Sequence, residues 1–250
     1  MAHAEWKGVR VVLLDIEGTT TPIDFVYKTL FPYASRNVGS FLAERSSDSE
    51  IRVLVRDLKT EQAKDVAAGF APPAWPSDPK GELRACDAYV QWLMARDSKC
   101  TPLKSLQGKI WQRGFESGEL HGEVYADVPP AFARWRRQGR EIAIYSSGSV
   151  LAQKSLFSTV RDRDLTCEIA AFFDTEVGVK TAAASYTKIA ASIAKAPEEV
   201  LFLSDAEKEV QAALAAGMFA ALCDRNSPRS QFLAIGAAES ITSFDEIFPD

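Results

Sequence analysis

The sequence has few of the residues that form disulfides or bind zinc. Its 250 residues include four cysteines and two histidines. The cysteines form no C-x-x-C pair, and their spacing does not suggest a zinc site; they are Cys86, Cys100, Cys167 and Cys223. Isolated thiols of this kind are usual in a reducing compartment, where they pack as small apolar side chains. We therefore expect buried, unpaired cysteines and no structural metal.

Long apolar runs and a strong excess of one charge are also absent. No run approaches the ~20 apolar residues that a membrane span needs, and the first ten residues, MAHAEWKGVR, lack the apolar segment of a secretory signal. The formal net charge of −5 gives no electrostatic reason to expect nucleic acid or an anionic membrane as partner. We expect a cytoplasmic monomer whose partner is a small molecule, with no nucleic acid and no membrane.

The predicted elements fall into two groups. Residues 9–14 form a run of strand length that is apolar except for Arg10, and residues 24–118 carry apolar residues at helical spacing with no confident strand. From about residue 125 strands alternate with helices, which implies parallel pairing through right-handed crossovers. We predict an α/β fold: a doubly wound, Rossmann-like parallel-sheet core, residues 1–23 and 119–250, with an all-helical cap, residues 24–118, inserted after the first strand.

Within the second group, individual elements can be assigned. Pro129 and Pro130 mark the start of a helix and Gly139 its end. Strands are predicted within residues 141–147, 169–174, 199–205 and 218–224, and helices from about residue 150, over 182–196 and over 206–217. In the first group, the proline-rich residues 70–81 must be a connection.

Polar side chains follow the predicted strands at the point where each strand ends. The first strand is followed by Asp15, Glu17, Thr19 and Thr20, the second by Ser146, Ser147 and Gly148, and a later one by Ser204 and Asp205, while Lys180 precedes a helix between them. Ligands bind beyond the carboxyl ends of parallel strands, so these residues should share one rim. A single Ser in such a place, such as Ser149 or Ser204, is more often a helix N-cap than a catalytic residue.

The carboxylates need a cation. Asp15, Glu17 and Asp205 on one rim would repel one another and lose hydration unless a metal compensated. An oxygen-only site with few protein ligands suits Mg²⁺, whereas zinc prefers His and Cys, which these segments lack.

That arrangement suits phosphoryl transfer. A metal-bound Asp15 can attack phosphorus and form an aspartyl-phosphate. Glu17 can protonate the leaving oxygen and later deprotonate the attacking water. The negative phosphoryl oxygens would be matched by Mg²⁺ and by donors at Lys180, Ser146, Ser147 and Gly148.

The motifs resemble those of the haloacid dehalogenase superfamily. DIEGTTTPI is similar to its first motif, with Glu17 where most members have a second Asp; IYSSGS, Lys180 and FLSDAEKE are similar to the other three. Further stretches, LFPYA, LQGKIWQRGFESGEL, YADVPPAFARWRRQGREIAIYSSGSVLAQKSLF, FFDT and ITSF, resemble the enolase-phosphatases of the methionine salvage pathway. The similarity runs from the first strand to the C-terminus and is weakest over residues 46–75.

The resemblance implies a bifunctional enzyme with one Mg²⁺ per subunit. It would enolise 2,3-diketo-5-methylthiopentyl 1-phosphate and then remove the phosphate to give 1,2-dihydroxy-3-keto-5-methylthiopentene. By the same resemblance Asp15 is the nucleophile and a metal ligand, Glu17 a ligand through its carbonyl and the acid/base, and Asp205 the last ligand. Ser146 and Ser147 match phosphate-binding positions, and Lys180 clamps the substrate and the intermediate.

Several alternatives stay open. Glu209 either supports Lys180 or the metal waters, or faces solvent on its helix. Phe25, Tyr27, Trp111 and Phe115 either contact the methylthio group or form the core of the cap, and His121 is more often a surface residue. Alternative functions are a simple phosphatase for another small substrate and a phospho-ligand-binding protein without turnover. A dehalogenase is disfavoured, because it has no need for the metal.

Overall fold

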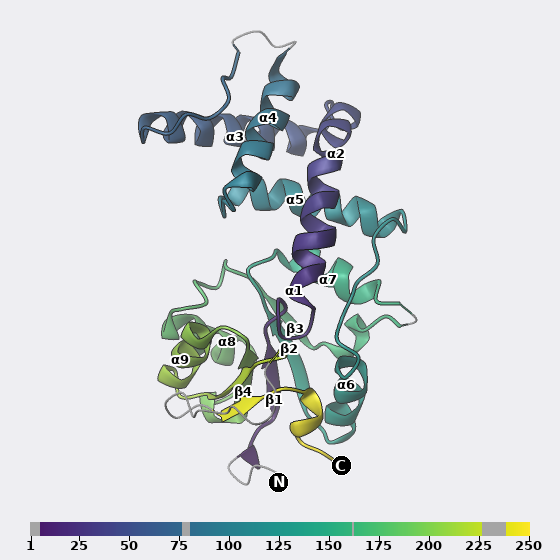
Figure 1. Ribbon diagram of the computed structural model, residues 1–250. Helices are drawn as coiled ribbons and strands as arrows, with labels where there is room; N and C mark the ends of the chain where they lie inside the picture. Colours follow the sequence, from purple (N-terminus) through teal and green to yellow (C-terminus); the bar gives the residue numbers. More distant parts are fainter. Residues whose placement is uncertain (1–5, 77–80, 162, 227–238) are drawn as a thin grey trace. The chain divides into compact units, whose positions relative to one another are not determined.

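The computed structural model describes residues 6–76, 81–161, 163–226 and 239–250, and it divides into two compact units (Figure 1). The first unit contains the described residues up to Phe25 and from His121 onward, and the second is Val26–Leu120. The assignment of these units as catalytic core and cap stays a prediction.

The first unit is built on one parallel sheet. Its six strands lie in the order β3-β2-β1-β4-β5-β6, and every neighbouring pair is parallel. The strands are β1 (Val11–Leu14), β2 (Glu141–Tyr145), β3 (Ala171–Phe173), β4 (Val200–Ser204), β5 (Phe219–Cys223) and β6 (Glu239–Ile241). The predicted doubly wound parallel sheet is confirmed, although β6 was not predicted, because its residues Glu, Ser and Ile form no apolar run such as the one that revealed β3.

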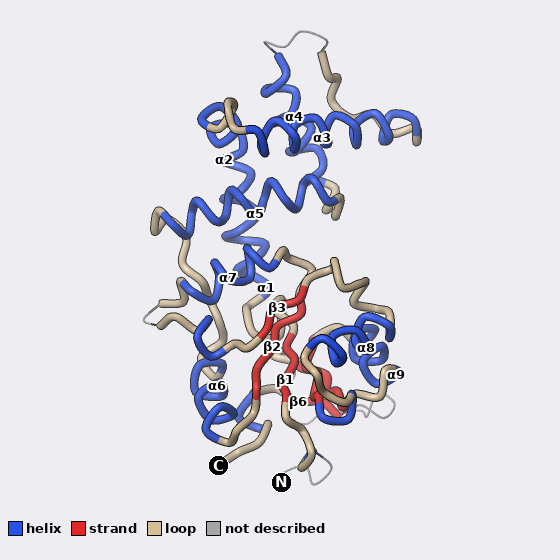
Figure 2. Tube along the Cα trace, turned by 180° about the vertical axis from the view of Figure 1, so that it is seen from behind, coloured by secondary structure: helices blue, strands red, loops and turns tan. Residues whose placement is uncertain are grey.

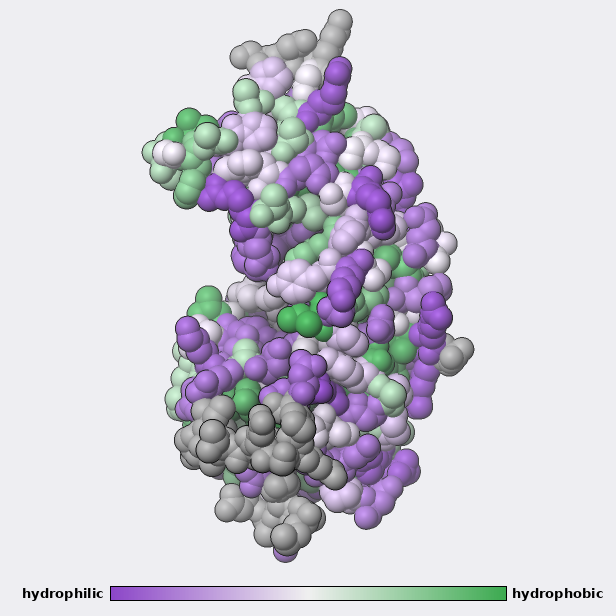
Figure 3. Space-filling model, viewed as in Figure 1, coloured by the Kyte–Doolittle hydropathy of each residue, from purple (hydrophilic) through white to green (hydrophobic). Residues whose placement is uncertain are grey.

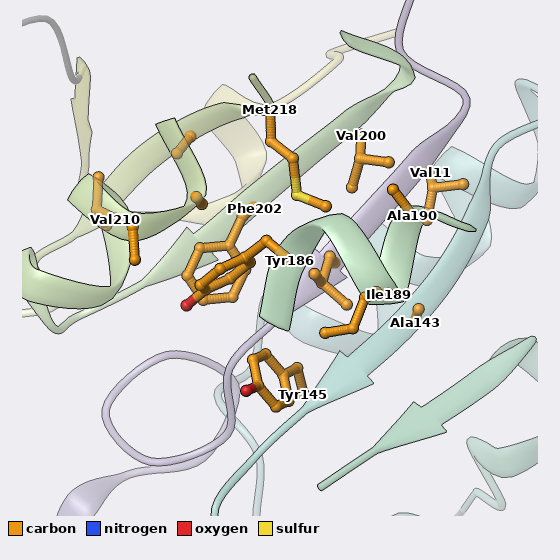
Figure 4. Packing of buried hydrophobic residues seen from close by; sticks show 14 residues of the cluster. Val11, Ala143, Tyr145, Tyr186, Ile189, Ala190, Val200, Phe202, Val210 and Met218 are labelled. Carbon is orange, nitrogen blue, oxygen red and sulfur yellow. The ribbon is translucent and has the colours of Figure 1, made fainter. Parts of the chain in front are cut away.

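The central strand β1 is covered on both faces. All four of its residues are buried, and Val11 lies opposite Glu141 on one side and Val200 on the other. Val11 and Leu13 point into a hydrophobic cluster with residues of the helices α8 and α9 (Figure 4). Because side chains alternate along a strand, Val12 and Leu14 point to the opposite face of the sheet. A strand buried on both faces explains the uninterrupted apolar run in the sequence.

Helices cover both faces of the sheet, with α8 and α9 on one side and α6 on the other (Figures 1 and 2). The helices of this unit are α1 (Ile23–Phe25), α6 (Val128–Arg137), α7 (Val150–Ser158), α8 (Ala183–Ser192) and α9 (Glu207–Ala215), with single 3₁₀ turns at Thr166–Glu168, Pro197–Glu199 and Phe244–Glu246. The predicted start of α6 at its two prolines is confirmed. Gly139 follows the helix with φ of 78°, a left-handed conformation that a glycine adopts without steric cost.

The order of the strands determines where a ligand can bind. The chain leaves β1 toward β2 and β3, returns to β4 on the other side of β1, and continues outward to β5 and β6. The connections of β1 and β4 therefore run in opposite directions, which opens a crevice at their carboxyl ends. Asp15 and Asp205 directly follow these two strands.

The second unit contains helices and, among its described residues, no strand. It comprises a π-helical segment, Val26–Leu30, followed by α2 (Phe31–Glu44), α3 (Ser49–Ala67), α4 (Glu82–Ala95) and α5 (Thr101–Glu116). The helical spacing predicted for residues 24–118 is confirmed by these helices, and the described part of the proline-rich connection between α3 and α4 is irregular.

The aromatic side chains considered for the methylthio group differ in their surroundings. Phe25 and Phe115 are both buried; Phe115 lies in the second unit, whereas Phe25 lies in the first and so is no part of the second unit's core. Tyr27 is 53% exposed and packs edge-on against Phe31, which stacks on Trp111. His121 is exposed, as expected.

The surface seen in Figure 3 mixes hydrophilic and apolar residues. None of the helices in the described residues is long and apolar enough to cross a membrane. All four cysteines are free, as expected, but only Cys86 and Cys223 are buried. The expectation of burial is wrong for Cys167, which is exposed within the 3₁₀ turn Thr166–Glu168, and Cys100 is half-buried.

Candidate active site

Asp15 and Lys180 meet at the carboxyl end of β1. Asp15 is 3% exposed, and its backbone N–H continues the sheet by donating to the Leu203 carbonyl at 3.0 Å. The Lys180 ammonium lies 2.5 Å from Asp15 Oδ1 and 2.7 Å from Glu209 Oε2. Lysine thus bridges two carboxylates that come from different strand ends. Of the alternatives for Glu209, the structure places it beside Lys180.

The charges of this cluster shift the proton affinity of its members. Burial alone would lower the pKa of Lys180, but the negative charges of Asp15 and Glu209 outweigh burial and raise it. Burial and the charge of Asp15 raise the pKa of the Glu209 carboxyl. The lysine therefore stays protonated at neutral pH, as a clamp for an anion requires.

Ser204, the last residue of β4, connects the two carboxylates through its hydroxyl. Its Oγ lies 2.9 Å from Glu209 Oε2 and 3.4 Å from Asp15 Oδ2, and it accepts the Ala206 N–H at 3.1 Å. The interpretation of Ser204 as a helix N-cap is wrong, because the N-cap of α9 is Ala206. Ser149 behaves as predicted, since it is the N-cap of α7 and accepts the Ala152 N–H.

The loop after β1 is held together by its threonines. The Thr20 hydroxyl donates to the Asp15 carbonyl at 3.1 Å, and the Gly18 N–H donates to the Thr21 carbonyl at 2.8 Å. Thr19 Oγ1 accepts the backbone N–H of Asp205 at 2.9 Å, which ties the loop to the end of β4. The loop and β4 are thus fixed as one rigid rim.

Gly18 permits the close approach of this loop to Asp205. Its φ is 73°, and a Cβ on Gly18 would overlap Oδ2 of the Asp205 carboxylate. Any side chain here would have to displace the carboxylate, which the Thr19 hydrogen bond holds through its backbone.

We expect Gly18→Ala to lower catalytic efficiency by about 100-fold, because a shift of roughly 1 Å in a reacting group has an effect of this size. Gly118→Ala is the matched control: its φ of 75° is nearly the same, but a Cβ there meets nothing within 4 Å. Both variants should lose about 1 kcal/mol of stability from the left-handed backbone, measured by thermal unfolding. Equal activities of the two variants would contradict the steric argument.

Asp205 is exposed at the rim, next to Gly18. Partial desolvation and the charges of Asp15 and Glu209 raise the pKa of its carboxyl from 3.8 to about 6. A cation between Asp15 and Asp205 would relieve this repulsion.

No group of three or more Asp, Glu, His or Cys side chains in the described residues is arranged to hold a metal. The predicted Mg²⁺ ligands are two carboxylates and the Glu17 carbonyl, and they do not require such a group of three side chains. Mg²⁺ binds through one or two carboxylates and keeps several waters. The donor chemistry therefore fits Mg²⁺.

The raised pKa of Asp205 predicts a pH-dependent stability of the metal-free protein. Between pH 3.8 and about 6 the native state binds more protons than the unfolded state, so stability falls as the pH rises through this window. Because the side chain is exposed, we expect Asp205→Asn to raise Tm by only about 2–4 °C at neutral pH in EDTA. The gain should vanish below about pH 4.

Thermal unfolding at both pH values tests this expectation, with Glu207→Gln, an exposed carboxylate on the first turn of α9, as control. If Asp205→Asn were no more stable than wild type at neutral pH, the repulsion described for Asp205 would not exist in solution.

Glu17 and Ser146 meet across β1 and β2. Ser146 Oγ lies 3.3 Å from Glu17 Oε2 and accepts the Gly148 N–H at 3.1 Å. Burial and the charge of Asp15 raise the pKa of Glu17, which favours the protonated carboxyl, the form that can donate a proton. Ser147 is exposed beside them. A phosphate reaching the Gly148 amide would compete with the Ser146 hydroxyl.

Arg225 supports the loop after β1, a role that the sequence did not reveal. Its Nε and Nη2 donate to the Thr19 carbonyl at 3.0 and 2.7 Å, and its Nη1 pairs with Asp127 Oδ2 at 2.5 Å. The guanidinium also lies over the ring of Tyr125. Arg225 lies in none of the quoted motifs, and both it and Asp127 are distant from Thr19 in the sequence, so only the folded structure brings the three together.

Comparisons with known proteins show the family of the chain. A family model for the haloacid dehalogenase-like hydrolases matches residues 9–217. A relative from Synechococcus elongatus named Enolase-phosphatase E1 is 47% identical over 240 residues, which is 96% of this chain and 98% of the relative. A relative of the same name from Drosophila grimshawi is 44% identical over 92% of this chain and 93% of its own length. The crystal structure of the UTR4 protein from Saccharomyces cerevisiae matches with a TM-score of 0.74 and 32% identity, over 96% of this chain and 100% of that one.

Proposed function

Since the chain belongs to the haloacid dehalogenase-like hydrolases and, within them, to the enolase-phosphatase E1 family, we propose that it is the bifunctional enolase-phosphatase of methionine salvage. Its substrate is 2,3-diketo-5-methylthiopentyl 1-phosphate, and its products are 1,2-dihydroxy-3-keto-5-methylthiopentene and phosphate. The observation that carries the proposal is the buried Asp15 carboxylate held by Lys180 at the crevice between β1 and β4.

Phosphate removal follows from the positions of three side chains. The Asp15 carboxylate attacks phosphorus, and the bond from phosphorus to the substrate's ester oxygen breaks as that oxygen takes a proton from Glu17. Lys180 holds Asp15 in place at 2.5 Å and faces the phosphoryl oxygens with its positive charge. Glu17 then removes a proton from water, which attacks the aspartyl-phosphate and releases phosphate and free Asp15.

Asp15, Asp205 and the Glu17 carbonyl would hold Mg²⁺, one per subunit. When bound, the ion neutralises negative charge on the phosphoryl oxygens and polarises the substrate. The hydroxyl of Ser146 and the backbone at Ser147 and Gly148 would contact the remaining phosphate oxygens. This metal and substrate assignment is supported by the all-oxygen donor set and by the raised pKa of Asp205.

The core of residues 1–23 and 119–250 and the cap of residues 24–118 form part of the same proposal. The cap would exclude water during enolisation, when charge develops on the diketone. We further propose that the enzyme acts in the cytoplasm as a monomer on this small molecule.

The length of the Glu17 side chain should affect enolisation more than phosphate hydrolysis. Most of the superfamily has Asp at this position, and the extra methylene of Glu17 extends its carboxyl toward the carbon acid. We expect Glu17→Asp to slow enolisation by about tenfold or more, with a smaller effect on hydrolysis of p-nitrophenyl phosphate. Deuterium uptake into a non-hydrolysable diketo phosphonate measures the first rate, with Glu207→Asp as an exposed control. Near wild-type values for both rates would remove any role for the extra length.

The decisive experiment is turnover of the authentic diketone phosphate in Mg²⁺. Enediol absorbance and free phosphate should rise as two separate signals from one enzyme, and both should stop in EDTA. Phosphate release without carbon-bound deuterium exchange would indicate a simple phosphatase. Failure to release phosphate from the diketone phosphate and from p-nitrophenyl phosphate would leave only a phospho-ligand-binding role.

A further inference from the structure

Three buried hydroxyls converge on the backbone that carries Lys180. Tyr145 donates to the carbonyl of Gly178 at 2.9 Å, Ser185 to that of Val179 at 2.8 Å and Tyr186 to that of Lys180 at 2.7 Å. The three acceptors are consecutive residues. The donors come from two elements, since Tyr145 ends β2 and the other two lie in the first turn of α8.

The donors are themselves immobile. Tyr145 and Tyr186 are fully buried and Ser185 is 2% exposed. The two tyrosine rings pack edge to face with centroids 5.6 Å apart, and Tyr186 packs on Phe202 at 5.0 Å (Figure 4). Their hydroxyl oxygens, red in Figure 4, are the polar ends of an otherwise apolar cluster.

The loop is shaped to accept these hydrogen bonds. Gly178 has φ of 148°, and a Cβ there would overlap the Ser185 hydroxyl. Glycine is therefore needed where the chain passes closest to α8.

We propose that Tyr145, Tyr186 and Ser185 are positioning residues that fix the backbone of Lys180 and so aim its ammonium between Asp15 and Glu209. This inference rests on the proposed function of Lys180 as the phosphoryl clamp. A lysine side chain has four rotatable bonds and no fixed geometry of its own. Its ammonium keeps distances of 2.5 and 2.7 Å to two carboxylates only if its Cα is held.

A purely structural role would not need this convergence. A buried tyrosine hydroxyl requires an acceptor, but any nearby carbonyl satisfies it. Here three hydroxyls share one short segment whose functional side chain is 10% exposed. Removing them frees the segment without opening a cavity, because Tyr→Phe deletes a single oxygen.

The test compares Tyr186→Phe and the double variant Tyr145→Phe/Tyr186→Phe with Tyr89→Phe. Tyr89 is the matched control: it is fully buried, its hydroxyl donates to Asp65 at 2.6 Å, and it lies in α4 of the second unit. The two single variants should lose similar thermal stability, and the double variant about twice as much, since it loses two hydrogen bonds. With p-nitrophenyl phosphate in Mg²⁺, kcat should fall about tenfold in Tyr186→Phe and about 100-fold in the double variant, with KM little changed. Tyr89→Phe should keep wild-type kcat.

A second readout does not depend on turnover. Acetic anhydride should label Lys180 slowly in wild type and at least about fivefold faster in the double variant, since an ammonium that leaves its two carboxylates deprotonates more readily. Peptide mass spectrometry gives the ratio to Lys64, whose side chain is 66% exposed. If neither kcat nor Lys180 labelling differed from Tyr89→Phe, the positioning role would be refuted. Faster labelling in a protein that does not turn over the diketone phosphate would uphold positioning and refute the proposed function instead.

Discussion

Asp15→Asn is expected to abolish phosphate release, with a loss in kcat of about 10⁴-fold or more, as for other enzymes that lose their nucleophile. An amide of the same shape keeps the space at the end of β1 but has no anionic oxygen to attack phosphorus. No aspartyl-phosphate can then form. Rapid acid quenching and peptide mass spectrometry should detect a phosphorylated Asp15 in wild type and none in the variant.

The effect must come from chemistry and not from a damaged fold. Asp15 pairs with Lys180 but is also repelled by neighbouring carboxylates, so removing its charge should change stability only modestly. Glu207→Gln, which neutralises an exposed carboxylate two residues beyond Asp205, should keep full activity. A folded Asp15→Asn protein that retained more than about one percent of wild-type phosphatase activity would rule out Asp15 as the nucleophile.

Lys180→Met should lower kcat by about 10³-fold and also destabilise the protein. The loss in activity follows from removing a buried positive charge that faces the transferred group. The loss in stability should be about 3 kcal/mol near pH 8, because Asp15 and Glu209 are left buried without their partner.

The stability defect of Lys180→Met should depend on pH in a definite direction. Without the ammonium the carboxylates bind protons more readily in the folded than in the unfolded state, so the variant gains stability as the pH falls toward 5. Denaturant unfolding in EDTA at about pH 8 and pH 5 measures this. Lys154→Met, an exposed lysine on α7, is the control and should show no such recovery. An equal defect at both pH values would mean that the carboxylates are not coupled to Lys180.

Much of the sheet could be predicted because its signals are local. Apolar runs of strand length alternate with helical periodicity, and prolines and glycines mark the ends of α6. Local signals were insufficient for β6, whose residues Glu, Ser and Ile include a single apolar side chain. Cys167 shows a further limit, since its exposure depends on tertiary packing and not on residue type.

The candidate site could be predicted where the type of a residue and its place at the end of a strand or helix indicate its chemistry. Asp15, Asp205 and Lys180 stand out as charged residues at strand or helix ends, and the fold brings Asp15 and Lys180 into contact. The sequence left the role of Glu209 open. Its place four residues after Asp205 does not show whether its side chain faces Lys180 or solvent. Arg225 could not be found, since an arginine that donates to a backbone carbonyl has no sequence signature.

The central position of β1 has a consequence for synthesis of the chain. This strand is translated before the rest of the sheet, yet its two neighbours, β2 and β4, begin only at Glu141 and Val200. The helices of the second unit emerge before either neighbour. The ribosome must therefore deliver the whole second unit and both neighbouring strands before β1 is enclosed. Until then the unpaired edges of β1 have to be shielded from other nascent chains, and the crevice beside it is complete only once β4 has been made.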